Sequence, residues 1–189
     1  MTVQTIFEIL YWVWIATEIL LQIVTPTRRR QGKVQDRGSL FVLVGVIFAS
    51  FWAAMAYGEM HPQNLLGGAA WLRIVGLALL AVGLAVRWTA VLTLGSSFST
   101  NVAIHATQKL RTNGLYRWVR HPSYSGMLII FMAVGIYERN WLSLAILLIF
   151  PTAALLYRIH VEERALKEAF GVEYLEYCRR TRCLVPLIY

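Results

Sequence analysis

Long apolar runs, almost free of charge, alternate with shorter polar segments along the chain. Three of these runs are Val3–Val24, Gly38–Tyr57 and Ala69–Leu94. A helix needs about 20 apolar residues to cross the hydrocarbon layer of a bilayer, and each run reaches that length. The pattern therefore predicts three membrane-spanning helices in the first half of the chain.

The remaining apolar residues form two shorter runs, 122–137 and 141–157, separated only by Glu138, Arg139 and Asn140. Helices joined by so tight a turn form a hairpin, and each can borrow length from its flanks to cross the membrane. With 189 residues, the chain is long enough for one domain. The predicted fold is all-α, a polytopic membrane protein with about five transmembrane helices.

Polar residues concentrate in two segments, 95–124 and 158–189, which follow the third and fifth spans. The second segment is predicted to continue the fifth span as a helix that ends near Gly171, since glycine is common at helix C-termini. A shorter helix through Tyr174 and Cys178 is expected to follow. We expect any chemistry to lie in these two segments, because the spans offer few polar groups.

Composition fits a membrane protein, with 58% hydrophobic and only 15% charged residues. The net charge of +8 does not indicate nucleic acid, because the basic residues fall in loops between apolar runs. Of the 18 lysines and arginines, all but Arg73 and Arg139 fall on one side of the predicted topology. The positive-inside rule and anionic membrane lipid account for this bias, which places the N-terminus outside and the C-terminus in the cytoplasm.

The two cysteines, Cys178 and Cys183, lie in a short basic tail with no second pair of cysteines. This spacing predicts free thiols and no metal site. Two glutamates, Glu8 and Glu18, lie inside the first span, where a charge is costly. We expect structural roles for both, with Glu18 near the inner end of its span and able to pair with Arg87 of the third span.

A cation, an imidazole and a phenol gather where the fourth span begins, in the run Arg120-His121-Pro122-Ser123-Tyr124. Proline suits the first turn of a helix, and free backbone N–H groups at such an end favour a carboxylate or a phosphate. The same residue types also anchor spans at the level of the lipid headgroups. This cluster is therefore either a ligand site or an interface anchor.

A second cluster lies where the fifth span leaves the membrane. Arg158 and Glu162 are four residues apart and share one helix face, whereas Glu163 is turned about 100° away. The shared face offers a cation for an anionic group and a carboxylate for an ammonium group. The alternative is an ordinary exposed ion pair within the helix, which contributes little.

Two segments, QKLRTNGLYRWVRHPSYSG at 108–126 and RIHVEERALKEAFGVEYLEY at 158–177, resemble the isoprenylcysteine carboxyl methyltransferase family. One helical hairpin separates them, as in that family, and the first two spans carry no family signature. The resemblance implies S-adenosylmethionine as cofactor. It also implies methyl transfer to a carboxyl group of a lipophilic small molecule or a prenylated substrate, at the cytoplasmic membrane face.

The resemblance further assigns roles to single residues. It implies that Glu162 accepts the ammonium group of the cofactor and that Arg158 receives the carboxylate of the substrate. An ionised carboxylate needs no general base, so positioning is expected to dominate catalysis. The remaining cofactor contacts implied by the resemblance are Gln108, Lys109, Leu110, Arg111, Tyr116, His121, Pro122, Ser123 and Tyr124.

Several features leave further classes of protein open. The chain has fewer spans than animal members of the family, so their prenyl-binding surface cannot be transferred to it. The ending CLVPLIY is similar to that of NADPH-dependent membrane sterol reductases, which share an Arg-His-Pro-x-Tyr element but lack the adjacent pair Glu162-Glu163. Phospholipid N-methyltransferases and non-enzymatic membrane scaffolds are two more classes that the residue pattern does not exclude.

Overall fold

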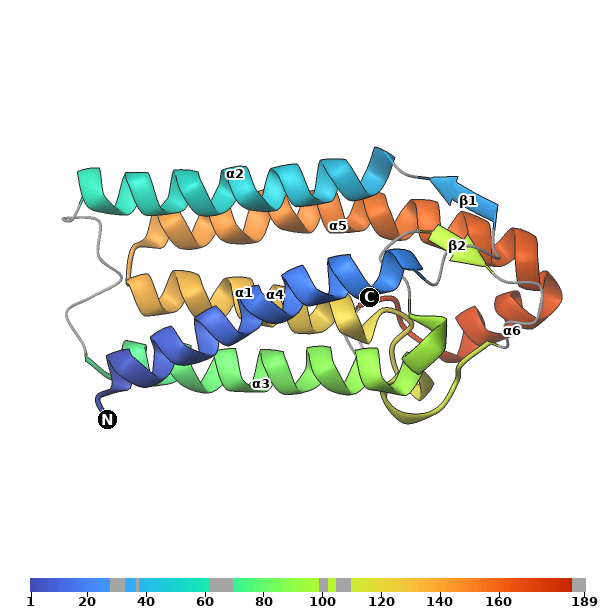
Figure 1. The fold of residues 1–189 in the computed structure, drawn as a ribbon, viewed down its shortest axis with the longest axis horizontal. Coiled ribbons are helices and arrows are strands. Elements are labelled where there is room, and N and C mark those ends of the chain that lie inside the picture. The colour runs from blue at the N-terminus through green and yellow to red at the C-terminus, as the bar shows by residue number, and fades with distance from the viewer. Residues whose placement is uncertain (28–32, 37, 62–69, 99–101, 105–109, 185–189) are drawn as a thin grey trace.

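The structure, a computed structural model, describes residues 1–27, 33–36, 38–61, 70–98, 102–104 and 110–184. Five long helices run side by side, and the short elements gather at one end, on the right in Figure 1. We call this the polar end. In chain order the elements are α1 (Val3–Thr27), β1 (Lys33–Asp36), α2 (Gly38–Met60), α3 (Trp71–Leu94), η2 (Gly95–Ser97), β2 (Val102–Ile104), η3 (Gly114–Arg117), α4 (Pro122–Glu138), α5 (Trp141–Phe170) and α6 (Val172–Arg180).

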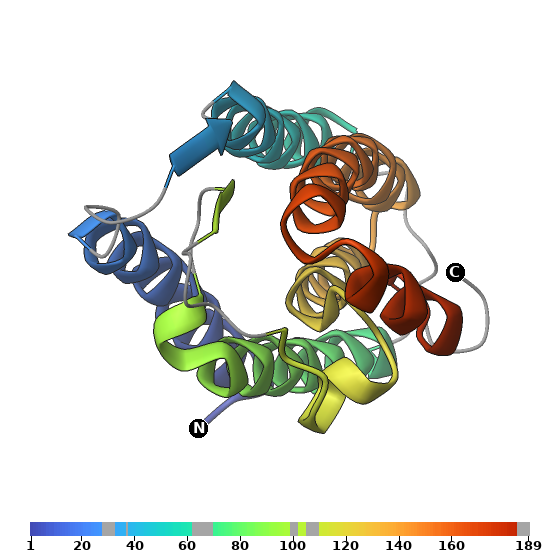
Figure 2. The ribbon, with the colours of Figure 1, turned by 90° about the vertical axis from the view of Figure 1, so that its right-hand side faces the viewer.

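Four helices, α1, α2, α3 and α5, are long and apolar enough to cross a membrane. Large apolar side chains such as Ile23 of α1 and Phe41 of α2 are 65% and 75% exposed, as expected for helices that face lipid. The prediction of an all-helical polytopic membrane protein is therefore confirmed. The fifth predicted span corresponds to α4, which has 17 residues and packs between α3 and α5 (Figure 2). That α4 crosses the whole membrane stays a prediction.

The helix α5 is a single unbroken helix of 30 residues, so the predicted continuation beyond 157 is confirmed. It ends at Gly171, whose φ of 52° lies in the region that favours glycine, and α6 follows directly. At its other end Asn140 caps the helix, because its side chain accepts hydrogen bonds from the N–H groups of Leu142 and Ser143, both at 3.1 Å. The tight hairpin brings the start of α4 and the last turns of α5 to the polar end.

The strands β1 and β2 pair in antiparallel fashion, with Lys33 opposite Ile104. The sequence did not predict them, since neither strand exceeds four residues. In the end-on view of Figure 2, α1 and α2 stand apart and the strands lie between them.

The helices α3 and α4 pack closely, and this packing fixes the position of the polar residues of one helix relative to those of the other. A Cβ added at Gly126 of α4 would lie 2.7 Å from the backbone nitrogen of Arg87, and one at Gly83 of α3 would lie 3.0 Å from the backbone nitrogen of Ile130. Small residues at such positions let two helix backbones approach each other in a membrane. Arg87 and the first turn of α4 are therefore held next to each other.

Candidate active site

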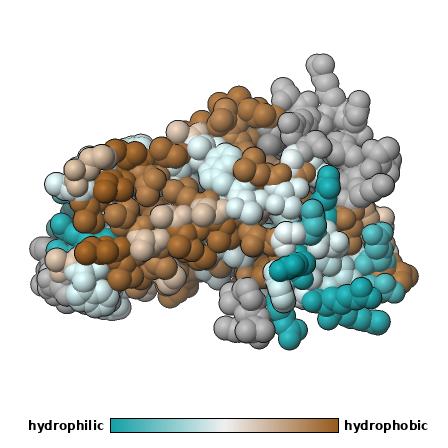
Figure 3. Space-filling model, turned by 90° about the horizontal axis from the view of Figure 1, so that it is seen from below, coloured by the Kyte–Doolittle hydropathy of each residue, from teal (hydrophilic) through white to brown (hydrophobic). Residues whose placement is uncertain are grey.

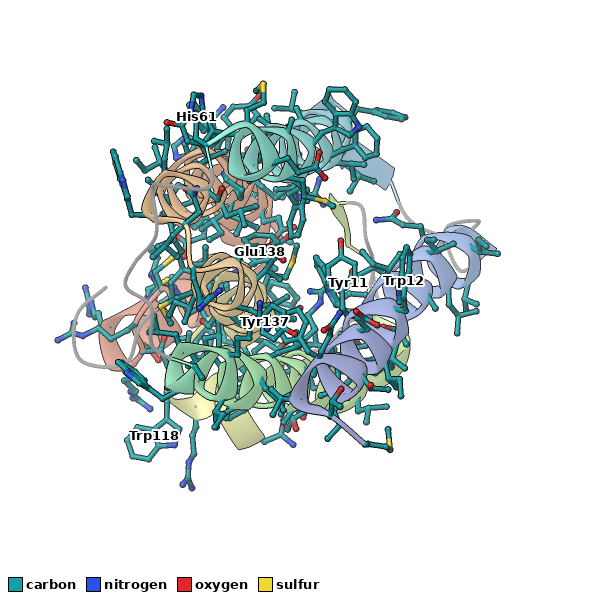
Figure 4. The ribbon with its side chains drawn as sticks, turned by 90° about the vertical axis from the view of Figure 1, so that its left-hand side faces the viewer. Tyr11, Trp12, His61, Trp118, Tyr137 and Glu138 are labelled. Carbon is teal, nitrogen blue, oxygen red and sulfur yellow. The ribbon has the colours of Figure 1, made fainter. Side chains whose placement is uncertain are left out.

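A cavity of about 660 Å³ opens between the helices and reaches from the polar end into the apolar part of the bundle. Its polar wall includes Arg87, Tyr124, Arg158 and Glu162. Most of its apolar lining comes from α1 and α2, and on α2 it extends from Leu40 to Met55, a rise of about 22 Å along the helix. Figure 4 shows Tyr11, another lining residue, directed into the space between α1 and α2. The cavity thus joins charged groups to a long apolar surface.

Arg158 lies at the centre of the polar wall and is almost fully buried, with 1% of its side chain exposed. Its Nε donates to Glu162 Oε1 at 2.8 Å, and its Nη1 donates to Ser39 Oγ of α2 at 2.7 Å. The hydroxyl of Tyr124 donates to the same Oε1 atom of Glu162 at 2.5 Å. Because the pair is buried in a cavity wall, the alternative of an exposed ion pair along the helix does not apply.

The second oxygen of Glu162, Oε2, has a different environment. Nδ1 of His121 lies 3.6 Å from it, and it accepts no hydrogen bond from the part of the chain that the structure describes. Two donors therefore hold one oxygen of the carboxylate in place, while the other retains lone pairs for a ligand. An ammonium group is the natural partner for such an oxygen.

Glu163 points away from the cavity and belongs to a separate cluster. Its Oε1 accepts a hydrogen bond from Arg120 Nε at 2.8 Å and lies 3.5 Å from His121 Nε2. Arg120 also donates through Nη1 to the carbonyl oxygen of Thr181 at 2.7 Å. Burial alone would lower the pKa of Arg120, but the hydrogen bond and the charge of Glu163 raise it above its usual value. This cluster ties α5, the start of α4 and the end of α6 together.

The C-terminal tail covers the beginning of α4. Backbone hydrogen bonds run from Arg120 N to Arg182 O at 2.8 Å and from His121 N to Cys183 O at 3.0 Å. The N–H groups of Tyr124 and Ser125 both bond to the carbonyl oxygen of His121. The expectation of free N–H groups that bind an anion at this helix end is therefore wrong for these residues, because the tail and the first turn already satisfy them.

The predicted pair between Glu18 and Arg87 is confirmed and is bidentate. Arg87 donates through Nε to Glu18 Oε1 at 2.8 Å and through Nη2 to Oε2 at 2.7 Å, and its Nη1 donates to Ser123 Oγ. Trp14 of α1 adds a donor to the same carboxylate at 3.3 Å. Both Glu18 and Arg87 line the cavity. Their positions in the sequence did not predict this.

Most of the residues that the family motifs mark meet at the cavity. Arg158 lines it, whereas Pro122 is buried in the first turn of α4 and is not part of the wall. Gln108 and Lys109 lie outside the described residues. The sequence analysis did not identify Ser39, because no neighbouring residue in the sequence marks it as the polar partner of an arginine. The implied cofactor contacts that line the cavity are Leu110, Arg111, Tyr116, His121, Ser123, Tyr124 and Glu162.

One cluster contains ligand types that metals use. Single ligand atoms of His121, Glu163 and Cys183 lie within 4.8 Å of one another. However, Glu163 is already bonded to Arg120, and burial together with the charge of Glu163 raises the pKa of the Cys183 thiol to about 11. A protonated thiol is a poor metal ligand, so this geometry fits an ion-pair cluster better than a metal centre.

Comparison with known proteins identifies the family. Residues 74–168 match the model of the isoprenylcysteine carboxyl methyltransferase family. Protein-S-isoprenylcysteine O-methyltransferase B of Arabidopsis thaliana is 35% identical over 120 residues, which cover 62% of this chain and 61% of that protein. The Homo sapiens protein-S-isoprenylcysteine O-methyltransferase is 32% identical over 130 residues, which cover 62% of this chain and 42% of the human one.

A solved structure of the eukaryotic intramembrane Ras methyltransferase ICMT, determined without a monobody, superimposes with a TM-score of 0.65 and 29% identity. The superposition covers 77% of this chain and 52% of that one. The chain thus spans less than two thirds of the length of these relatives. Because the family model matches half of the residues, including α4 and most of α3 and α5, the chain belongs to the isoprenylcysteine carboxyl methyltransferase family.

Proposed function

We propose that this protein transfers a methyl group from S-adenosylmethionine to the carboxylate of a lipophilic, isoprenylated substrate. The observation that carries the proposal is the cavity in which the ion-paired residues of the family motifs border a long apolar wall. A cofactor with an ammonium group and an acceptor with both a carboxylate and an apolar chain fit these two surfaces. A prenylated protein, or a small prenylated cysteine derivative, has this chemistry.

The polar wall offers suitable groups for the cofactor. Glu162 Oε2 is oriented to accept a hydrogen bond from the ammonium group, since Arg158 and Tyr124 hold the other oxygen. His121 also lines the cavity, and its Nδ1 lies 3.6 Å from Glu162 Oε2. Tyr116 adds an aromatic ring to the lining of the cavity. When bound there, S-adenosylmethionine would supply an electrophilic methyl group on a sulfonium.

The acceptor carboxylate is the nucleophile and is ionised at neutral pH, so no residue has to remove a proton. One carboxylate oxygen would bond to the methyl carbon that the cofactor supplies, and the electron pair of the broken carbon–sulfur bond would stay on sulfur, which would give a methyl ester and a neutral thioether. Arg158 would hold the carboxylate through its planar guanidinium group so that one lone pair faces the methyl group. Orientation of the two reactants is the main contribution of the protein.

The reaction would take place at the cytoplasmic face. The polar end carries the site, whereas Arg73 and Arg139 lie at the opposite end with the N-terminus of α1 (Figure 1). With 16 of the 18 basic residues on one side of the topology predicted from the sequence, the positive-inside rule favours a cytoplasmic C-terminus and an N-terminus outside.

A binding and turnover experiment tests the proposal. Calorimetry on the protein in detergent should detect S-adenosylmethionine and its demethylated product but not NADPH. An N-acetylated S-isoprenylcysteine with a free carboxylate should be methylated, and the matched carboxamide should not. Binding of NADPH alone would favour a reductase, methylation of a lipid amine would favour a phospholipid methyltransferase, and absence of all binding would favour a scaffold. Each of these three outcomes would overturn the proposal.

A further inference from the structure

Exposed arginines gather on the outer surface of the polar end, away from the cavity. We use the name arginine patch for Arg117, Trp118, Arg179, Arg180 and Arg182, all of which are exposed and none of which lines the cavity. A backbone hydrogen bond from Arg182 N to Trp118 O at 3.0 Å holds the two segments side by side. The guanidinium carbon of Arg117 lies 4.8 Å from the centre of the Trp118 ring.

The arginines of the patch have no anionic partner within the described part of the chain. The buried arginines at the same end, Arg87, Arg120 and Arg158, are all paired with glutamates, whereas no patch arginine enters an ion pair. Residues 110–137 contain no Asp or Glu, and neither do residues 177–184. Even Glu176, one turn before Arg180, forms no ion pair with it among the contacts within 4.0 Å. The part of the chain that the structure describes therefore provides no anion for these charges.

The patch lies at the depth where the spans end. A hydrogen bond from Tyr116 OH to Ala90 O at 3.4 Å places η3 beside the last turns of α3, and Trp118 precedes the first residue of α4 by four positions. Trp118 is 60% exposed and projects outward from the bundle (Figure 4). Tryptophan and arginine at the ends of spans are typical of the layer of lipid headgroups.

The exposed face of α6 carries both apolar and basic side chains, as a helix in a membrane interface does. Val172 and Leu175 are 71% and 48% exposed, and the helical repeat puts Arg179 on the same face. Figure 3 shows hydrophilic residues gathered at the polar end, beside the apolar surface of the bundle. A surface with apolar side chains next to arginines that form no ion pair fits the boundary between the acyl chains and the phosphate groups of a lipid layer.

We propose that the arginine patch binds the headgroups of anionic bilayer phospholipids and thereby seats α6 and the tail in the headgroup layer. The planar guanidinium group of arginine can bind two phosphate oxygens through two parallel N–H groups. Arginine is therefore better suited than lysine to this contact. Each basic residue near an anionic membrane surface strengthens association roughly fivefold. The selection of anionic over zwitterionic lipid should therefore depend on the patch.

Spin-labelled lipids can test this with the full chain in phosphatidylcholine vesicles. The wild-type protein should associate with labelled phosphatidylglycerol at least fivefold more strongly than with labelled phosphatidylcholine. Arg179→Gln/Arg182→Gln should lose most of this preference, and Arg179→Lys/Arg182→Lys should keep part of it. The control Arg139→Gln/Arg164→Gln, which removes two positive charges outside the patch, should keep the preference, and thermal unfolding in detergent verifies that all variants are folded.

Two results would overturn the proposal. The first is an equal loss of preference in the patch variant and in the control variant, which would mean that only net charge matters. The second is displacement of labelled phosphatidylglycerol by millimolar inorganic phosphate as readily as by unlabelled phosphatidylglycerol, which would mean that the patch binds free anions rather than the lipid surface.

Discussion

Replacing Glu162 by glutamine separates the proposed ligand role of this carboxylate from its structural role. The variant removes one negative charge from the cavity wall while the side chain keeps its size. The amide oxygen can still accept hydrogen bonds from Arg158 and Tyr124, which now donate to Oε1 at 2.8 and 2.5 Å. Glu163→Gln is the matched control, because this neighbouring carboxylate binds Arg120 and is not part of the cavity wall.

The magnitude follows from the lost charge. A hydrogen bond to a charged group contributes about 1.5 to 3 kcal/mol, which corresponds to roughly a tenfold to hundredfold change in a dissociation constant. Only 19% of the Glu162 side chain is exposed, so screening by solvent is limited. We expect Glu162→Gln to weaken binding of S-adenosylmethionine by this amount, and Glu163→Gln to change it by less than about tenfold. The cost of Glu163→Gln should instead be reduced thermal stability.

Calorimetry with two ligands tests the assignment. The demethylated cofactor keeps the ammonium group but lacks the charged sulfonium, so both ligands should lose affinity equally if Glu162 binds the ammonium group. Loss of S-adenosylmethionine affinity alone would mean that Glu162 senses the sulfonium. Equal losses in the Glu162 and Glu163 variants would refute the reasoning altogether, because of these two residues only Glu162 lines the cavity.

Three further predictions follow from single observations. Arg158→Lys keeps the charge but loses the planar fork that reaches Glu162 and Ser39, so single-turnover methylation should fall, and by at least about tenfold in Arg158→Ala, with cofactor affinity nearly intact in both variants; a parallel fall in affinity would show that Arg158 only orients Glu162. A reporter fused to the C-terminus should be active in the cytoplasm, and activity only outside would contradict the orientation. In a Cys178→Ser background, alkylation of Cys183 should be slow below pH 9 and accelerate toward pH 11, because the raised pKa lowers the thiolate fraction; rapid labelling near neutral pH would contradict this.

The bundle could be predicted from hydropathy, but the helix ends could not. Apolar runs mark the part of a helix that lies in hydrocarbon, whereas the helix itself continues as long as its residues favour it. The helix α5 therefore extends to Phe170, beyond the predicted span 141–157. The strands β1 and β2 carry no detectable alternation within three or four residues, so their pairing has no local signal.

In the site, a contact between residues close in the sequence could be predicted, whereas contacts between distant residues could not. The contact between Arg158 and Glu162 follows from helical spacing and was predicted. The bond from Arg158 to Ser39 joins residues 119 positions apart, and the tail pairs with the start of α4 through backbone atoms alone. Backbone pairing leaves no mark in side-chain patterns, which is why the sequence could not show that the tail bonds to Arg120 and His121 at this helix end.

The two walls of the cavity also differ in how much sequence change they tolerate. The polar wall needs particular donors and acceptors at fixed positions, because a buried charge without its partner is strongly destabilising. The apolar wall needs only side chains of suitable size, since hydrophobic contact is not directional. The family match at residues 74–168 includes Arg87, Tyr124, Arg158 and Glu162 of the polar wall, whereas α1 and α2, which supply most of the apolar lining, lie outside it. Shared cofactor chemistry would therefore be compatible with different acceptors among relatives, and under the proposed function the choice of the apolar group in this protein would depend mainly on α1 and α2.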